Sequence, residues 1–231
     1  MKRKTMRAAA AAAMLAAGPA LLPGVGHAAD PLSLRLGDVP VKGVIPDGYC
    51  LPTGADKAAA DMLAKGDPDN QTHAMLIRCD QRNKVGGTKY DYYLVKSPHA
   101  QSPAMKRAEF IALMTEELKL PAYQSGHATR PEIGKAGDNL STALGTKVDL
   151  SGEIRPRGAD TVCIYMGGEL EVRSEFASYP IAVGGCGTVV AGHILFVYAY
   201  DDPVKPNSGA ALLQRTRWIA ERLKATDGRA N

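Results

Sequence analysis

The most regular pattern of apolar and polar positions lies in the carboxyl-terminal half of the chain. Residues 147–154 alternate apolar with polar, which is typical of a strand with one buried face. Residues 181–202 predict two strands joined by a tight turn at Ala191–Gly192, which places Val190 opposite His193. Both faces of the second strand are largely apolar, so we expect a central strand covered on both sides.

Helical spacing predicts three helices. The first covers residues 53–65, between short strands, with Thr53 and Asp56 at the spacing of a capping box. The second lies within residues 102–120, where Ser102 is placed to cap it. The third begins near Ser208 and carries an apolar stripe towards residue 225.

The amino terminus has the three parts of a secretory signal peptide. Four basic residues precede an uncharged run rich in alanine and leucine, and small residues precede the expected cleavage after Ala28. The apolar run is too short for a spanning helix, so we expect no transmembrane segment after cleavage. The predicted organisation is a signal peptide (1–28), an extended surface segment (29–45), one α+β domain (46–226) and a tail (227–231).

Removal of the signal peptide changes the charge of the chain. The sequence has 28 lysines and arginines against 24 acidic residues, and four of the basic ones lie in the first 28 positions. The mature chain therefore has no formal net charge, which gives no general reason to bind nucleic acid. No phosphate-binding glycine loop occurs in a suitable context, so we expect no cofactor.

An even number of cysteines in an exported chain predicts disulfides. Cys50 and Cys79 lie on predicted strands on either side of the first helix, and Cys163 and Cys186 lie on two later strands. Three connectivities are possible for four cysteines. We favour Cys50–Cys79 and Cys163–Cys186, because each half of the chain then forms a local pair.

A different interpretation makes Cys186 a nucleophile with His193 as its base. A thiol enzyme needs a thiolate, an oriented base and donors for the oxyanion. The predicted hairpin weakens this hypothesis, because it places Cys186 opposite a residue near Val197 rather than opposite His193. Cys163 on a neighbouring strand is a ready disulfide partner in an oxidising compartment.

Residues 121–145 are expected to form a long polar loop, and loops on a rigid sheet often carry binding residues. Its candidate contact residues are Tyr123, Gln124, His127 and Arg130. The alternative is a surface loop without a binding role. The histidines of the chain are widely separated and show no metal-ligand spacing, so we expect no metal site.

The order of predicted elements favours an α+β fold, with an antiparallel sheet covered by helices in an α/β sandwich. The layout resembles the Mog1/PsbP-like superfamily over roughly residues 44–226. The resemblance rests on Pro46, Asp47 and Gly48 near the first strand, on the hairpin at 192–202 and on the terminal helix at 208–225. It implies a non-enzymatic accessory or binding protein, and no catalytic residue can be transferred from that superfamily.

The sequence therefore predicts an exported, disulfide-stabilised binding or accessory protein in the periplasm or outside a bacterial cell. Its partner, a protein or a small molecule, is not specified by any motif. The alternative function is a thiol-dependent enzyme that uses Cys186 with His193.

Overall fold

The computed structural model describes residues 30–84, 90–100, 103–205 and 208–227. The predicted signal peptide and the predicted cap Ser102 lie outside these described residues.

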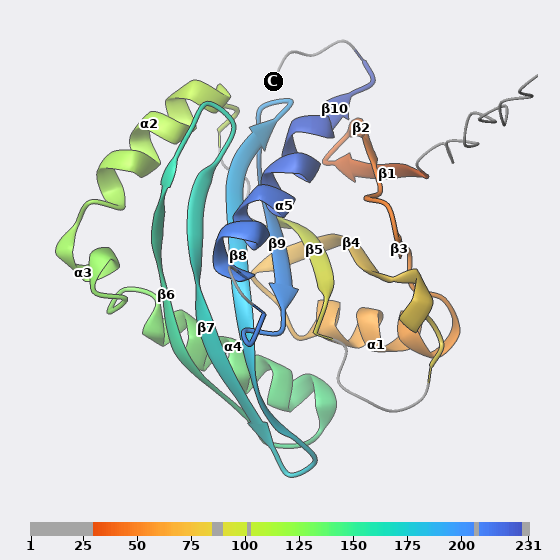
Figure 1. Cartoon of the computed structure of the whole chain (residues 1–231). Coiled ribbons are helices and arrows are strands. Elements are labelled where there is room, and N and C mark those ends of the chain that lie inside the picture. The colour runs from red at the N-terminus through yellow and green to blue at the C-terminus, as the bar shows by residue number, and fades with distance from the viewer. Residues whose placement is uncertain (1–29, 85–89, 101–102, 206–207, 228–231) are drawn as a thin grey trace, which may run out of the picture.

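Within the described residues, the strands form two antiparallel sheets (Figure 1). The small sheet has the order β1-β2-β10, and the large sheet has the order β3-β4-β5-β9-β8-β7-β6. The strands are β1 (Pro31–Leu36), β2 (Val39–Val44), β3 (Tyr49–Cys50), β4 (Asn70–Arg78), β5 (Tyr92–Pro98), β6 (Val148–Ala159), β7 (Ile164–Ser174), β8 (Ser178–Val190), β9 (His193–Asp201) and β10 (Lys224–Ala225).

Helices lie on both sides of the large sheet. In Figure 1, α5 crosses the front of the sheet over β8 and β9, and α4 passes behind it beside β6. The helices are α1 (Gly54–Lys65), α2 (Arg107–Glu117), α3 (Pro121–Gln124), α4 (Arg130–Leu144) and α5 (Ser208–Arg222), with a short 3-10 turn at Cys79–Gln81. The predicted α+β class, an antiparallel sheet covered by helices, is confirmed.

The predicted carboxyl-terminal hairpin has the expected register. Ala191 and Gly192 have positive φ angles of 52° and 84°, which suits a two-residue turn between right-twisted strands. Val190 pairs with His193, and Cys186 pairs with Val197. β9 lies between β5 and β8, so it is a central strand as predicted.

The apolar stripe of α5 joins this hairpin to the small sheet. Leu212, Ile219 and Leu223 are almost fully buried in one cluster with residues of β1, β2 and β9. The helix approaches the sheet closely at Gly184, where a Cβ atom would lie 2.6 Å from the Cβ of Leu212. α5 ends at Arg222, and the chain then forms β10, which the sequence did not predict.

Of the predicted surface segment 29–45, the described residues 30–45 do not precede the fold as a surface segment. They form the β1–β2 hairpin, in which Leu32, Leu36, Val39 and Val41 are each 1% exposed. Glycine and proline suggested an irregular segment, but the leucines and valines alternate with polar residues over each short strand.

Residues 121–145 are not a long loop either. They form α3 and α4, and α4 ends at Gly145, whose φ of 67° is typical of a helix stop. The polar composition misled the prediction because only a narrow face of α4, at Ile133 and Gly137, is buried against β6.

α1 begins directly after Thr53 as predicted, but its capping hydrogen bonds differ, and α2 begins later than predicted. α2 begins at Arg107, four residues after Pro103, and the carboxylate of Glu109 accepts the backbone N–H of Lys106 at 3.1 Å. At α1 the predicted capping box is not formed, and Thr53 and Asp56 instead accept hydrogen bonds from Asn83. Asn83 therefore connects the start of α1 to the segment that follows β4.

The outer edge of β6 is partly closed by side chains from the α4 region. Thr129 donates its hydroxyl hydrogen bond to the carbonyl of Ile154 at 2.8 Å. The hydroxyl of Ser141 accepts the backbone N–H of Val148 at 2.8 Å and also lies 3.1 Å from its carbonyl oxygen. At these two positions, backbone groups of the edge strand that could pair with another strand already have a side-chain partner.

Candidate functional site

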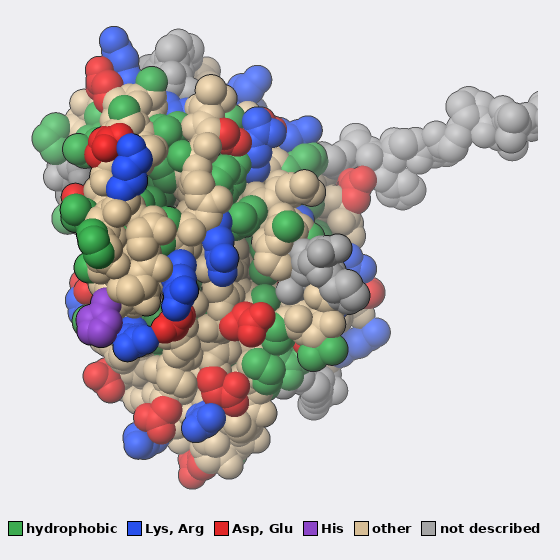
Figure 2. All heavy atoms as spheres, turned by 60° about the vertical axis from the view of Figure 1, so that its left-hand side comes forward, with side chains coloured by type: hydrophobic (Ala, Val, Ile, Leu, Met, Phe, Trp, Pro, Cys, Tyr) green, Lys and Arg blue, Asp and Glu red, His purple; other side chains and the backbone are tan. Residues whose placement is uncertain are grey.

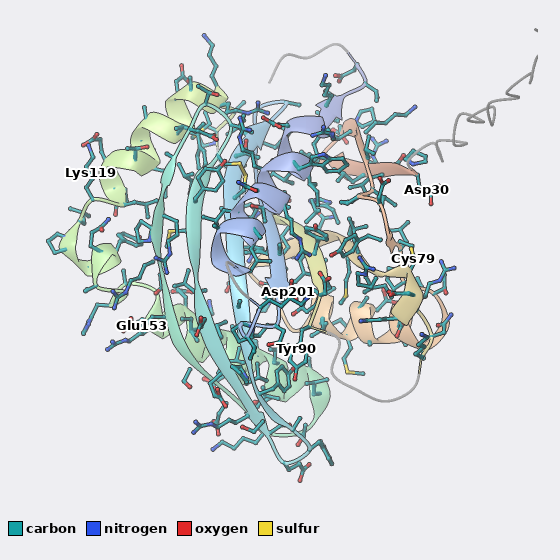
Figure 3. The ribbon with its side chains drawn as sticks, in the orientation of Figure 1. Asp30, Cys79, Tyr90, Lys119, Glu153 and Asp201 are labelled. Atoms are coloured by element: carbon teal, nitrogen blue, oxygen red, sulfur yellow. A yellow bond between two sulfur atoms is a disulfide. The ribbon has the colours of Figure 1, made fainter. Side chains whose placement is uncertain are left out.

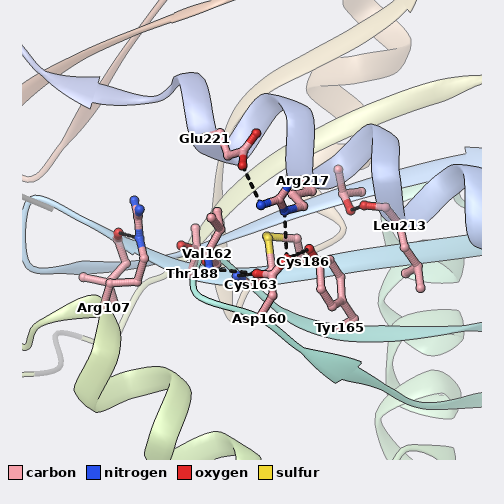
Figure 4. Close-up of a disulfide and its surroundings, with 12 residues drawn as sticks. Arg107, Asp160, Val162, Cys163, Tyr165, Cys186, Thr188, Leu213, Arg217 and Glu221 are labelled. Atoms are coloured by element: carbon pink, nitrogen blue, oxygen red, sulfur yellow. Dashed lines mark hydrogen bonds and ion pairs between the residues drawn. A yellow bond between two sulfur atoms is a disulfide. The ribbon is translucent and has the colours of Figure 1, made fainter.

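The structure contains one of the two predicted disulfides. Cys163 and Cys186 are joined with a Cα–Cα distance of 5.2 Å, and both residues are almost fully buried (Figure 4). The bond links β8 to the turn that precedes β7.

Asp160 organises that turn. One carboxylate oxygen accepts the backbone N–H groups of Val162 and Cys163 at 2.7 and 2.9 Å. The other accepts the hydroxyl of Tyr165 and the Nε–H of Arg217, both at 2.7 Å (Figure 4). Burial alone would raise the pKa of Asp160, but these hydrogen bonds and Arg217 lower it. The disulfide region is thus tied to α5 through one carboxylate.

The thiol-enzyme hypothesis does not fit this arrangement. The sulfur of Cys186 is bonded to Cys163, so it is not a free nucleophile. Val190 is the partner of His193, and Cys186 lies four residues away along β8, which corresponds to roughly 13 Å. His193 is therefore too distant to act as the base for Cys186.

The second predicted disulfide is not formed in the structure. Cys50 is buried on β3, Cys79 is exposed at the end of β4 (Figure 3), and neither is bonded to another cysteine. Burial raises the pKa of the Cys50 thiol to about 11, and a hydrogen bond between the two thiols adds to the shift. The prediction placed these two cysteines side by side correctly but was wrong about the bond.

The predicted contact residues of the 121–145 segment separate into different roles. Tyr123 packs against the cluster beneath α2, and Gln124 donates a hydrogen bond to the carbonyl of Leu118 at 2.8 Å. Arg130 forms an ion pair with Glu153 at 2.7 Å, and His127 is exposed. Only Arg130 contacts the charged face of β6 described next, and the buried Gly126 beside His127 lies against the same strand.

A groove of about 620 Å³ opens where the first turn of α5 overlooks β6 and β7. α5 packs mainly against β8 and β9. The face of β6 and β7 on the same side of the sheet is therefore left uncovered and forms the groove. In Figure 2, basic and acidic side chains gather around the middle of this face, where much of the surface is backbone and uncharged side chains. The groove is lined by Glu153, Arg155, Arg157, Gly167, Gly168, Glu169, Ala182, Gly209, Ala210 and Leu213.

Half of the charge in this groove is already paired. Glu153 projects from β6 (Figure 3) and forms ion pairs with both Arg130 and Arg155. Those hydrogen bonds, the one from Arg130 first, lower the pKa of Glu153. The pair Glu153–Arg155 is therefore a fixed element of the wall.

The other half of the charge remains available. Arg157 donates only its Nε–H, to the carbonyl of Gly167 at 3.2 Å, so its two terminal nitrogens have no partner among the described residues. The side chain of Glu169, opposite Glu153 in the sheet, forms no ion pair or hydrogen bond with the described residues. The sequence analysis did not identify these residues, although the alternation of Glu153, Arg155 and Arg157 is a signal that they share one face.

A second pocket, of about 560 Å³, lies between the Pro46–Asp47 turn and α5. Its charged centre is Arg215, which donates to Tyr93 at 2.8 Å, to Tyr49 at 2.7 Å and to Asp201 at 3.1 Å, and also pairs with Asp91. Burial alone would lower the pKa of Arg215, but these partners raise it. Every nitrogen of this guanidinium is used within the protein, so we assign the cluster a structural role.

Among the residues that the structure describes, no three His, Cys, Asp or Glu side chains are grouped to hold a metal ion. In the same part of the chain, no helix has the length and apolar character needed to cross a membrane.

Comparison with known proteins gives a likeness of fold only. No protein-family model matches the chain, and no curated protein matches it. Among solved structures, cyanobacterial PsbP (CyanoP) from Synechocystis sp. PCC 6803 aligns with 90% of this chain and 99% of its own, at 11% identity and a TM-score of 0.42. No statement about the family or function of this chain rests on that similarity.

Proposed function

We propose that this chain is an exported accessory protein that binds its partner in the groove between β6, β7 and the first turn of α5. The observation that carries the proposal is the open groove of about 620 Å³ with a positioned arginine, Arg157, whose terminal nitrogens are unused. Pockets of this size, with a few placed polar groups on a mainly small and apolar floor, are typical of ligand sites.

The remaining parts of the proposal come from the sequence. The signal-peptide pattern supports export to the periplasm or the exterior, where a buried disulfide such as Cys163–Cys186 persists. A binding role also suits a groove whose wall is held in place by ion pairs on Glu153. The proposal includes no nucleic acid and no cofactor.

Site-specific photo-crosslinking tests this function. A photoreactive phenylalanine analogue is placed at Ala210, an exposed groove position, and at Ala136, an exposed position on α4 outside the groove. We expect the protein isolated from the exporting cells to carry a defined adduct, by intact mass, only when the probe is at position 210. The same adducts at both positions, or none at position 210, would contradict the proposal.

A further inference from the structure

We infer that the groove recognises a small zwitterion, an amino acid or a dipeptide, whose carboxylate binds Arg157 and whose ammonium binds Glu169. This inference rests on the proposed binding function and specifies its ligand. The shared chemistry of the two ligand types is one carboxylate and one ammonium on a short, otherwise uncharged molecule.

Arg157 supplies the anion site. Its Nε–H is held by the carbonyl of Gly167, and its stem crosses that glycine, where a Cβ atom would lie 3.3 Å from the Arg157 Cγ. The contact fixes the direction of the side chain while it leaves both terminal nitrogens free. A guanidinium with two parallel N–H groups matches a carboxylate in a bidentate manner.

Glu169 supplies the cation site. It is exposed in the groove wall, and it has no partner within the described chain. The arginines of the wall do not neutralise it, because Arg155 is paired with Glu153 and Arg157 is held by Gly167. An ammonium group is the natural counterpart of a free carboxylate, which also has four lone-pair positions for its hydrogen bonds.

The spacing of the two free charges suits a short ligand. Gly167 and Glu169 are two residues apart on the same face of β7, a separation of about 7 Å along the strand. The side chains of Arg157 and Glu169 both line the groove, so a molecule whose carboxylate and ammonium are a few bonds apart can contact both of them.

The rest of the groove accepts an uncharged side chain. Ala182 and Leu213 provide apolar surface beside the charged pair, and Gly167 and Gly209 leave it unobstructed. At about 620 Å³, the groove has room for a second residue, which is why a dipeptide is included. A ligand with only one charge would leave either Arg157 or Glu169 without its partner.

Calorimetric titration of the mature protein tests the inference. The probes are L-leucine and L-leucyl-L-leucine, with acetate and ethylammonium as ligands that carry only one of the two charges. We expect at least one zwitterion to bind and neither single-charge probe to give measurable binding. Comparison of the two zwitterions distinguishes the free amino acid from the dipeptide.

The variants Arg157→Gln and Glu169→Gln are each expected to weaken zwitterion binding at least tenfold. Arg173→Gln is the matched control, since Arg173 is an exposed arginine of β7 outside the groove. All three positions are exposed, so their thermal unfolding should match the parent protein.

Several outcomes would overturn the inference. They are absence of zwitterion binding, acetate binding as tight as that of leucine, or wild-type affinity in Glu169→Gln. Photo-crosslinking at position 210 separates this failure from failure of the proposed function. A defined adduct there without zwitterion binding would reject the ligand class and keep the groove as the binding site.

Discussion

Arg215 of α5 and Arg157 of β6 are both arginines beside a pocket, but they use their hydrogen-bond donors in opposite ways. Arg215 directs all its nitrogens to Tyr49, Tyr93, Asp91 and Asp201 of the protein itself. Arg157 gives one N–H to a backbone carbonyl and keeps its terminal nitrogens free.

The contrast extends along α5. Gly209 and Ala210 of its first turn line an open groove, and Arg215 and Arg217, less than three turns further on, are held by carboxylates of three different segments. A single helix therefore serves as an anchor along its later turns and as one lip of a groove at its beginning. The difference indicates that arginines whose donors are all used within the protein stabilise the fold, and that an arginine with unused donors is available for a ligand.

The largest expected effect comes from replacing Arg215, whose donors are all used within the protein. Arg215→Met should lower the free energy of unfolding by about 3–5 kcal/mol, because Asp91 and Asp201 lose a shared cation in a partly buried site. Urea denaturation measures the change. Arg157→Met is the matched control and should change stability by less than about 0.5 kcal/mol. Equal losses in the two variants would remove the distinction between them.

The next effect concerns the disulfide beside the later turns of α5. The double variant Cys163→Ala/Cys186→Ala should lose about 3 kcal/mol, the loop-closure value for a sequence separation of 23 residues. The double variant Cys50→Ala/Cys79→Ala is the control and should lose less, because its thiols close no loop in the structure. Urea titration of both proteins without reductant makes the comparison, and a larger loss in the control would contradict it.

The smallest effect is a pH dependence carried by Asp160. Because its pKa is lowered in the folded protein, this carboxylate stabilises the fold above its unfolded pKa of about 4, and the contribution is lost as the pH falls through the lower folded value. Asp160→Asn should therefore be less stable than the parent at pH 7 by about 2 kcal/mol, and the gap should narrow at pH 3. Thermal unfolding at both pH values measures it, and a constant gap would show that charge plays no part.

The fold was predictable where a periodic pattern reports directly on burial. The hairpin at Ala191–Gly192 and the stripe of Leu212, Ile219 and Leu223 illustrate this, since each residue's neighbours are close in sequence or on one helical face. α4 was missed because its buried face is only Ile133 and Gly137, which is too narrow to stand out in a polar segment.

The candidate site was not predictable in the same way. The groove exists because α5 stops short of β6, and the relative placement of a helix and a strand more than 40 residues apart is not encoded in any local pattern. Arg155 and Arg157 stand two positions apart in the sequence, as residues on one face of a strand do. Whether each guanidinium has a partner depends on Arg130, Glu153 and the carbonyl of Gly167. Of these residues, only Arg130 was predicted from the sequence as a contact residue.

The side chains that occupy the edge of β6 have one more consequence. Thr129 donates to the carbonyl of Ile154, and Ser141 accepts the N–H of Val148, so a strand from another molecule meets a backbone acceptor and a backbone donor that are already in use. These contacts discourage self-association by sheet extension at β6, the longest edge strand among the described residues. The proposed contact with a partner would therefore be made by the side chains on the face of β6, not by its backbone edge.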